Sequence, residues 1–558
     1  MKPHQLFVVG LLVMGLCALP AIPIAAPLPQ ERVDLDAMAK IREEGLQRSQ
    51  LMVTASYLTD VFGPRLTNSP NIRAAAQWTV GKMNEWGLAN VKLEPWGPFG
   101  RGWSNERTSV AMTRPYAFPL IAYSRAWTPG TNGTVTGDVV LAILNTPADL
   151  EDCRGKLGGK FVMTAAASVL QAQFRPAGSR LTDEDLERLA NPPQRGRGGP
   201  QAGGAPRGNA PVPAKLPGQL CGGTLPAPPA PRGQGQRGQQ NFGNERNRFL
   251  LNEGVLAMLA PGQATGSVAG GTVFVQSGGN RGLNDPPVPA QLSLAAEHYG
   301  ILMRNVEKNV PVALEVNIEN KFYDDDLNSF NIIGEIPGTD KASEVVMVGA
   351  HFDSWHTGTG ATDNAAGSAI MMEVMRILKA TGLPLRRTVR IALWTGEEEG
   401  LLGSQAYVRD HFAVRQTMEL KPEHSRMSVY FNVDNGTGQI RGVYMEGNEG
   451  ARPVFEAWME PFKDFGMTTL TARGTGGTDH TNFEAVGLPG FQFIQDDIEY
   501  DTRTHHSNMD VYERLQSKDM IQNAVIVASF VYNASNREDL FPRKPLPPPP
   551  GQRGGRGQ

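Results

Sequence analysis

Cysteine is scarce in this sequence, and charge and aromatic residues are sparse. The 558-residue chain has three cysteines, 20% charged residues and 7% aromatic residues. Three cysteines are too few for a disulfide-built scaffold, so buried apolar cores must hold a chain of this length. The net charge is −3 at pH 7. A chain without an excess of Lys and Arg lacks the basic surface that nucleic-acid binding requires, so no nucleic-acid partner is expected.

Long apolar runs are also missing, except at the start of the chain. Leu6–Leu19 is a continuous apolar stretch of about 14 residues, shorter than the roughly 20 residues of a membrane-spanning helix. Lys2 precedes it and the small residues Ala25 and Ala26 follow it, a pattern typical of secretory signal peptides. We therefore predict a signal peptide over residues 1–26, a secreted or periplasmic protein and no stable membrane span. An uncleaved anchor is the alternative.

Two cysteines remain beyond the predicted signal peptide, Cys153 and Cys221. In an exported protein they could form a disulfide. Two buried thiols would fit the sequence equally well, and the spacing is not that of a metal site.

Glycine and proline are concentrated in two segments. Residues 191–245 hold 13 Gly and 11 Pro in 55 positions, and such a segment buries too little apolar surface to offset its chain entropy. We predict a disordered insertion there, and a disordered Pro/Gly/Arg tail over residues 542–558. Aromatic residues for base stacking are nearly absent from 191–245, which argues against an RNA-binding Arg-Gly segment.

The rest of the chain alternates between strand and helix patterns. Short strand patterns surround the low-complexity insertion, at 133–144, 159–165, 254–261 and 271–277, and predict a small β-rich domain. From about residue 300, buried apolar strands alternate with amphipathic helices. This predicts an α/β domain with a mostly parallel sheet and helices on both faces.

Polar residues with metal-binding side chains follow the predicted strands of this α/β domain. Ligands of open α/β sheets bind at the carboxyl ends of the strands, so residues at these positions are expected to converge. The candidates are His351, Asp353, Asp363, Glu397, Glu398, Glu399, Asp434, His505 and His506.

Imidazole nitrogen and carboxylate oxygen together suit Zn²⁺, with Mn²⁺ or Co²⁺ as alternatives. A single catalytic zinc uses three protein ligands, whereas the candidates here outnumber that set and favour two ions sharing a carboxylate. The adjacent residues Glu397 and Glu398 can divide the labour, one binding metal and the other acting as a general base. Taken alone, the Glu397–Glu399 triplet could instead be a charge cluster at a helix N-terminus.

At these residues the sequence resembles the secreted co-catalytic zinc exopeptidases, the group of bacterial leucyl aminopeptidases and glutamate carboxypeptidases. GPRLTNSPN at 63–71 and the doubled His505-His506 look most like the plasma glutamate carboxypeptidase branch. The ordered motifs are VGAHFDSW, GATDNAAGSA, WTGEEEGLLGSQAY, NVDNGTG, GGTDHTNFEAVGLPG and THHSNMDVY.

The resemblance implies two Zn²⁺ ions and a role for each matched residue. Asp363 matches the carboxylate that bridges both ions, and Glu397 matches the general base. Asp353 matches the carboxylate that orients the ligand His351. His505 stands where some relatives carry a tyrosine, which makes it a candidate oxyanion or substrate contact or a packed structural histidine. The remaining ligands are His351 and Asp434 for one ion, and Glu398 and His506 for the other.

The resemblance also implies how the domains are arranged. The β-rich piece resembles the protease-associated domain that several members of the family carry as an insertion. The predicted divisions are the signal peptide (1–26), the first part of the catalytic domain (27–125), the protease-associated-like insertion (126–295), the rest of the zinc peptidase domain (296–541) and the tail (542–558).

The predicted function is that of a secreted zinc metallo-exopeptidase acting on a peptide or dipeptide, with aminopeptidase action as the first choice. The alternative is a carboxypeptidase or dipeptidase like plasma glutamate carboxypeptidase, which would need Arg or Lys beside the metals. Arg473 and Arg503 lie near motif loops and are candidates for that role. A glutaminyl cyclase and an inactive receptor-like homologue fit less well, because the ligand set and Glu397 are complete. The oligomeric state is not predicted.

Overall fold

The computed structural model describes residues 31–168, 170, 172–174, 176–192, 215–224, 236–262 and 270–551. The predicted signal peptide, 1–26, lies outside the described residues. So do most of the predicted disordered insertion and the last seven residues of the predicted tail.

The first domain is built on a sheet of eight described strands. The neighbours β13, β12, β16 and β19 pair in parallel, and the strands outside them include antiparallel partners. In spatial order the strands are β1 (Ala89–Trp96), β11 (Ser329–Ile336), β13 (Arg387–Trp394), β12 (Lys341–His351), β16 (Met427–Asn432), β19 (Gly490–Gln495), β17 (Ile440–Tyr444) and β18 (Thr469–Thr471).

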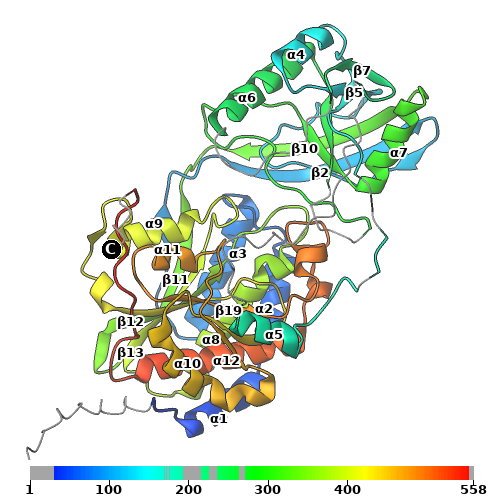
Figure 1. Ribbon diagram of the computed structural model, residues 1–558. Coiled ribbons are helices and arrows are strands. Elements are labelled where there is room, and N and C mark those ends of the chain that lie inside the picture. The colour runs from blue at the N-terminus through cyan, green and yellow to red at the C-terminus, as the bar shows by residue number, and fades with distance from the viewer. Residues whose placement is uncertain are drawn as a thin grey trace, which may run out of the picture.

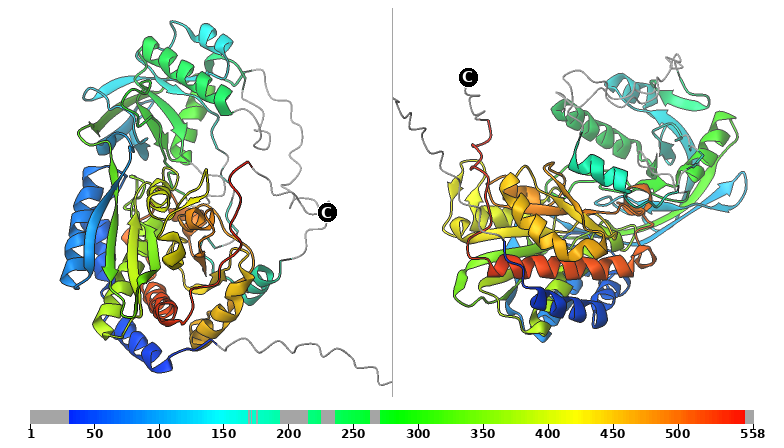
Figure 2. Two further views of the ribbon diagram at one scale, coloured as in Figure 1. Left: turned by 90° about the vertical axis from the view of Figure 1, so that its left-hand side faces the viewer. Right: turned by 60° about the horizontal axis from the view of Figure 1, so that its bottom comes forward.

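Helices cover both faces of this sheet, which confirms the predicted α/β class (Figures 1 and 2). Apolar side chains of one helix group pack against one face: α1 (Leu35–Gln47), α2 (Leu51–Ser56), α3 (Pro70–Glu85), α8 (Ala366–Thr381), α10 (Arg452–Met459) and α12 (Ser517–Asn536). Two helices pack against the other: α9 (Leu402–His411) and α11 (His480–Glu484). A small ladder of β14 (Ala413–Val414) and β15 (Glu419–Leu420) follows α9.

The second domain has its own sheet and its own apolar cores, and it sits above the first domain in Figure 1. Its described strands run in the order β3 (Phe118–Pro119), β2 (Gly102–Arg114), β10 (Ala313–Tyr323), β5 (Val135–Ile143), β6 (Phe161–Met163), β8 (Ala257–Pro261), β9 (Gln291–Leu294) and β4 (Ala122–Ser124), with β7 (Gln219–Gly222) beside β5. Its helices are α4 (Pro147–Cys153), α6 (Gln236–Glu253) and α7 (Ala296–Glu307).

The second sheet extends beyond the predicted insertion, 126–295. The long strands β2 and β10 lie outside those limits and pair with each other along their whole length, so they belong to the second sheet. Within 191–245, where disorder is predicted, the described residues include β7 and the first part of α6. Cys221 of β7 is disulfide-bonded to Cys153 of α4, which resolves the alternative that the sequence left open. The predicted strand at 271–277 forms only isolated bridges.

The C-terminal segment also differs from its prediction. Although disorder is predicted from residue 542, the described residues there lie along the first domain. The Pro542 carbonyl accepts a hydrogen bond from Asn448 (2.8 Å), Lys544 forms an ion pair with Glu484, and the Pro548 carbonyl accepts one from Arg415 (3.0 Å). Proline lacks a backbone N–H donor but keeps its carbonyl acceptor. A proline-rich segment can therefore be held in place through its carbonyls and through flanking charged side chains.

One segment of the second domain reaches down to the first. Helix α5 (Asp183–Ala190) packs against β18, and the chain before it pairs with the loop that follows β19 (Figure 1). Ser179 exchanges two backbone hydrogen bonds with Ile498, each 2.9 Å long. Arg180 forms ion pairs with Asp496 (2.8 Å) and Asp519 (2.7 Å). We call residues 176–190 the arm.

An ion-pair cluster fixes β1 at the edge of the first sheet. His411, at the end of α9, contacts Glu94 of β1 through Nε2 (2.7 Å) and Glu423 through Nδ1 (3.3 Å). Burial opposes a charged imidazole, but the hydrogen bonds to Glu423 and Glu94 outweigh it and raise the pKa of His411 to about 9. Burial likewise disfavours the charged form of Glu94, but hydrogen bonds from His411 and Lys92 lower its pKa to about 2.

We expect the stability that His411 contributes to depend on pH. Its folded-state pKa lies above the unfolded value of 6.5, so its contribution, about 3 kcal/mol at most, is complete below pH 6.5 and is lost as the pH rises through 9. The contribution of Glu94 is complete above its ordinary pKa of 4.5 and is lost as the pH falls towards 2. Thermal unfolding of wild type and His411→Gln should therefore differ most between pH 5 and 6 and converge near pH 10. A difference that is constant with pH would contradict this.

Candidate functional site

The parallel strands deliver the candidate residues to one edge of the first sheet. His351 is the last residue of β12, and Asp434 lies two residues beyond β16. Glu397 and Glu398 follow β13, and His506 follows the turn after β19. Asp363 lies in the segment Ala361–Ala365 that leads into α8, and its own backbone is not helical (φ −132°, ψ 83°). Because neighbouring parallel strands end at the same edge, these loops meet although they are far apart in sequence.

A first group consists of His351, Asp363 and Asp434. His351 Nε2 lies 3.2 Å from Asp363 Oδ1 and 3.3 Å from Asp434 Oδ1. All three side chains are buried, and their ligand atoms lie within 4.8 Å of one another, a separation that one metal ion can span. The other ring nitrogen, Nδ1, is 3.0 Å from the Asp353 carbonyl oxygen. That contact places Nε2 towards the two carboxylates.

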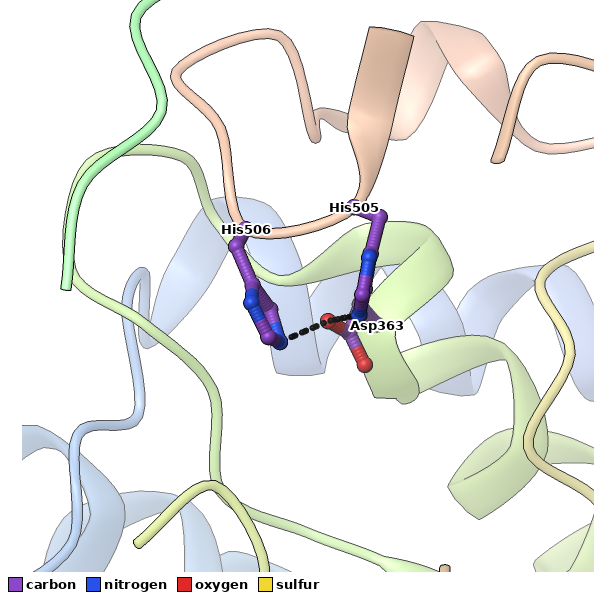
Figure 3. Close-up of side chains that lie close together, drawn as sticks. All are labelled: Asp363, His505 and His506. Carbon is purple, nitrogen blue, oxygen red and sulfur yellow. Dashed lines mark ion pairs between the residues drawn. The ribbon is translucent and has the colours of Figure 1, made fainter. Parts of the chain in front are cut away.

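A second group shares Asp363 with the first. His506 Nε2 lies 3.4 Å from Asp363 Oδ2 and 2.9 Å from Glu398 Oε2. His505 also faces Asp363, at 3.9 Å, and Figure 3 shows both rings directed at this carboxylate. The ligand atoms of Asp363, His505 and His506 also lie within 4.8 Å of one another. The two oxygens of Asp363 thus face different groups, Oδ1 the first and Oδ2 the second.

Buried acidic side chains with few compensating charges gather at this edge of the sheet. Burial, then Asp434 and Asp479, raises the pKa of Glu397 well above its ordinary value, against the opposing pull of His351. Burial and the charge of Asp363 do the same to the pKa of Glu398. Among the described residues, Asp363 Oδ2 and Glu398 Oε1 are buried without a hydrogen-bond donor. Buried carboxylate oxygens without donors are costly unless a cation compensates them, so the donor set fits divalent metal ions.

Backbone and side-chain hydrogen bonds hold the acidic loops in place. Asp353 accepts hydrogen bonds from the amides of Glu397 (3.3 Å) and Glu398 (3.2 Å) and from the Thr67 hydroxyl (3.0 Å). Asp510 accepts from the amide of Asp363 (3.1 Å). Asp353 therefore touches both the loop of His351 and the Glu397–Glu398 pair.

The GPRLTN segment, residues 63–68, forms buried hydrogen bonds with the same loops. Arg65 is fully buried and donates to the carbonyls of Phe352 (2.8 Å), next to His351, and of Gly360 (2.9 Å), three residues before Asp363. Thr67 contacts the amide of Gly396 (3.0 Å) as well as Asp353. The GPRLTNSPN motif thus stabilises the loops of the site from a buried position.

Four of the other histidines make their contacts elsewhere. His356 contacts the Ser124 carbonyl (2.7 Å), and burial lowers its pKa to about 4. His424 contacts the Val486 carbonyl (2.9 Å), and His480 lies 3.3 Å from Glu446. His411 belongs to the cluster at β1. These four side chains are structural.

Two cavities flank the metal-ligand candidates, and Glu398 lines both. The first, which we call the acidic cavity, has a volume of about 390 Å³. Its described lining residues are Asp363, Glu397, Glu398, Gly400, Leu401, Asp434, Asn435, Gly476, Gly477, Thr478, Tyr500, His505 and His506. It contains no Arg or Lys among them, and neither Arg473 nor Arg503 reaches it.

The second cavity, which we call the interdomain cavity, has a volume of about 640 Å³ and lies between the two domains. One wall comes from the first domain and includes Phe99, Trp355, Glu398 and Glu399; the other comes from the second domain and includes Trp127, Gln276–Ser277, Gly279–Gly282 and Asp285. The sequence did not reveal Gln276, Arg281 or Tyr500 as site residues, because none stands in a motif with recognisable spacing.

The second domain contacts the His506 loop directly. The Val275 amide donates to the His506 carbonyl (3.1 Å), and the Gln276 side-chain amide lies 3.0 Å from His506 Nδ1. His506 adopts a φ of +56°, a left-handed conformation that is uncommon outside glycine. A backbone hydrogen bond from the second domain therefore helps to fix an unfavourable conformation in the first.

Comparison with known proteins shows that part of the chain is similar to a known family. Residues 331–531 match the model of Peptidase family M28, which confirms the resemblance to the zinc exopeptidases. Carboxypeptidase Q of Pongo abelii is 30% identical over 258 residues, which cover 46% of this chain and 52% of that protein. Aminopeptidase YwaD of Bacillus subtilis is 30% identical over 262 residues, 45% of this chain and 55% of that protein. The match thus spans about half the length of these curated relatives.

The fold is similar over a longer stretch. The crystal structure of a peptidase M28 precursor from Shewanella amazonensis superposes with a TM-score of 0.61, covering 92% of this chain and 98% of that one at 20% identity. Since the coverage exceeds the 331–531 region, the structural likeness includes parts of the chain that the family model does not reach.

Proposed function

We propose, on the premise that residues 331–531 match Peptidase family M28, that this protein is a two-metal exopeptidase. One observation carries the proposal: Asp363 presents Oδ1 to His351 and Oδ2 to His506, so a single carboxylate joins two groups of ligand atoms. That arrangement is typical of two-metal hydrolases.

The proposed ligand sets follow the two groups. His351 and Asp434 would hold one Zn²⁺, Glu398 and His506 the other, and Asp363 both. Zinc suits mixed imidazole and carboxylate donors, and Mn²⁺ and Co²⁺ are the alternatives. When bound, such ions lower the pKa of a water molecule and polarise a substrate carbonyl. The backbone carbonyl of Asp353 contacts His351 Nδ1 at 3.0 Å, and its carboxylate Oδ1 lies 3.6 Å from the same nitrogen, so Asp353 would fix the orientation of the ring.

Glu397 is the proposed general base. It lines the acidic cavity beside Glu398, and burial raises the pKa of its carboxyl well above the ordinary value, which favours its taking up a proton. Glu397 would take the proton of the attacking water and return it to the departing amine. His505 lines the same cavity and its ring packs against Tyr500, with centroids 4.8 Å apart. Both are proposed substrate or oxyanion contacts.

The acidic cavity favours aminopeptidase action. Its carboxylates and backbone carbonyls can accept hydrogen bonds from a free α-ammonium group, and no Arg or Lys is found among its described lining residues. Carboxypeptidase or dipeptidase action needs a cation on the other side of the scissile bond.

An assay of zinc-loaded protein tests the proposal. Purified protein should hydrolyse peptides with a free amino terminus and should lose activity on chelation, with recovery on adding Zn²⁺. Aminoacyl arylamides, N-blocked peptides and dipeptides should be compared side by side. Cleavage of N-blocked peptides would contradict the aminopeptidase assignment, and absence of any peptide hydrolysis by protein carrying two zinc ions would contradict the exopeptidase proposal.

We expect Gln276 to tighten metal binding although it belongs to the second domain. With His506 Nε2 directed at the metal site, the Nδ1 proton can be donated to the Gln276 carbonyl after rotation of the amide. Gln276→Leu should weaken the zinc held by His506 by about 10- to 100-fold, measured by calorimetric titration. Gln276→Glu keeps an acceptor and should bind zinc nearly as well as wild type. Equal affinities for wild type and Gln276→Leu would contradict this.

We also propose that the protein acts outside the cytoplasm. The disulfide between Cys153 and Cys221 is compatible with export, and it supports the signal peptide predicted over 1–26. Among the described helices, none is long and apolar enough to span a bilayer. The second domain corresponds in position to the predicted protease-associated-like insertion, which remains a proposal.

A further inference from the structure

One wall of the acidic cavity is a short glycine-rich segment, residues 474–478, which we call the glycine loop. It lies between β18 and α11, and Gly476, Gly477 and Thr478 line the cavity. Gly476 and Gly477 are exposed. Among the described residues beyond their chain neighbours, no atom lies within 4 Å of the position that a Cβ would take at either glycine. Side-chain packing does not hold this wall, so its position depends on what fixes the two ends of the loop.

A hydrogen bond fixes each end of the glycine loop. At the far end, Thr478 Oγ1 accepts from the side-chain amide of Asn432, the last residue of β16, at 3.0 Å. At the near end, Glu446 Oε1 accepts from the Thr475 amide at 2.8 Å. The two glycines that line the cavity therefore lie between an anchor on the central sheet and an anchor on Glu446.

Glu446 is closely fitted to the glycine loop. It stands in the turn after β17, its side chain is 10% exposed, and its φ is +52°, a left-handed conformation that is uncommon outside glycine. A Cβ at Gly474 would lie 2.2 Å from Glu446 Oε2, so only glycine leaves room for the carboxylate. His480 Nε2 lies 3.3 Å from Glu446 Oε1 and 3.2 Å from the Thr475 carbonyl. The carboxylate thus contacts both the loop and the first residue of α11.

The C-terminal tail reaches the backbone of the same residue. Lys544 Nζ donates to the Glu446 carbonyl at 2.5 Å and forms an ion pair with Glu484, the last residue of α11. Since Glu446 has an unfavourable backbone conformation, a donor on its carbonyl helps to keep the position from which its carboxylate reaches the loop. Contacts therefore run from the tail through Glu446 to the wall of the acidic cavity.

We propose that Glu446 is a positioning residue for substrate binding, supported by Lys544 of the C-terminal tail. The inference rests on the proposed exopeptidase function, in which the acidic cavity receives the amino terminus of the substrate. Without the Glu446 carboxylate, the near end of the glycine loop is free, and a substrate must order it on binding at a cost in affinity. Neither Glu446 nor Lys544 is found among the described residues that line the two cavities. The effect should therefore fall on KM and not on the chemical step.

Substitution of Glu446 tests the proposal through this separation of KM from kcat. In zinc-loaded protein, Glu446→Ala should raise the KM for an aminoacyl arylamide about 5- to 30-fold, the cost of ordering one backbone residue, and change kcat less than about threefold. Glu446→Gln keeps an oxygen that can accept from the Thr475 amide, so its KM should stay close to that of wild type. Lys544→Met should raise KM by a smaller factor than Glu446→Ala. Glu449→Ala and Lys463→Met, which remove charged side chains from surface ion pairs, are the matched controls.

Gly474→Ala gives an independent test in the full chain. The three atoms nearest to the added Cβ all belong to Glu446, and Gly474 does not have a positive φ, so the new methyl group should displace the carboxylate and little else. KM should rise as it does in Glu446→Ala. In a double variant with Glu446→Ala the methyl group has no carboxylate to displace, so Gly474→Ala should add nothing further. Additive effects would contradict the inference, and Gly474→Ala carries the test alone if Glu446→Ala fails to fold.

Hydrogen–deuterium exchange and product binding separate this inference from the proposed function. The Thr475 amide should exchange at least about 10-fold faster in Glu446→Ala than in wild type or Glu446→Gln, because it loses a hydrogen bond to a charged group. Calorimetry should show weaker binding of L-leucine to Glu446→Ala by the same factor as the rise in KM. If no peptide is cleaved, the proposed function fails, and these two measurements decide the role of Glu446.

Three results would overturn the role of Glu446. One is an equal KM for wild type and Glu446→Ala, and another is a fall in kcat without a rise in KM. The third is unchanged L-leucine binding by Glu446→Ala although its Thr475 amide exchanges faster, since the loop would then be held without consequence for the cavity.

Discussion

Glu397→Gln is expected to lower kcat by about 10²- to 10⁴-fold while zinc remains bound. The amide keeps the size and shape of the carboxyl but cannot accept the proton of the attacking water. Glu397 lies in neither of the two groups of ligand atoms around Asp363, so its loss should leave the metal content unchanged. The adjacent Glu398 faces His506 at 2.9 Å and cannot replace it as a base while it serves as a ligand.

Two measurements on the same preparation check this result. Elemental analysis should give the wild-type zinc content for Glu397→Gln, and steady-state kinetics should show the fall in kcat. Glu449→Gln is a suitable control because Glu449 pairs with Arg452 on the surface, away from the site. If Glu397→Gln retained a tenth or more of the wild-type kcat, another group would have to be the base.

Asp363→Asn is expected to reduce zinc affinity by more than about 100-fold at both ions. Loss of an outer contact costs 10- to 100-fold in metal affinity, and a ligand shared by two ions should cost more. The substitution removes the negative charge that faces both His351 (3.2 Å) and His506 (3.4 Å). Activity should disappear with the metal.

Zinc titration of the metal-free protein measures the effect. Asp410→Asn is the matched control, since Asp410 pairs with Arg409 at the surface. Loss of only one zinc from Asp363→Asn would show that the carboxylate serves a single ion, and wild-type stoichiometry and affinity would exclude it as a ligand.

Much of the site could be predicted from the sequence because the residues that follow neighbouring parallel strands converge at one edge of the sheet. Each candidate ligand follows an apolar strand, and the strands β13, β12, β16 and β19 end at one edge. The positions of the strand ends therefore predict that His351, Glu398 and Asp434 lie close together, without the full strand order. The preference for His506 over His505 as a ligand stays a prediction. In the structure His506 faces both Asp363 and Glu398, whereas His505 is farther from Asp363.

Residues that reach the site from the second domain could not be predicted. Gln276 and Arg281 stand in an irregular segment, where neither strand nor helix periodicity says which side chains share a surface. Their contacts with His506 and Phe99 depend on how the two domains pack, which composition and spacing do not encode. The same holds for the tail at Pro542 and Lys544, where low complexity suggested disorder but the carbonyls and charges found partners on the first domain.

The arm, residues 176–190, has a consequence for any attempt to shorten this protein. Its contacts at Asp496 and Ile498 join the second domain to the chain just before the His505–His506 turn, and Asp519 of α12 is a further contact. The segment at 273–276 contacts the same turn directly. Deleting residues 126–295 would remove both the arm and the contact of 273–276 with the His505–His506 turn. The part of the chain that resembles an accessory domain thus supports the candidate site and is not a detachable module.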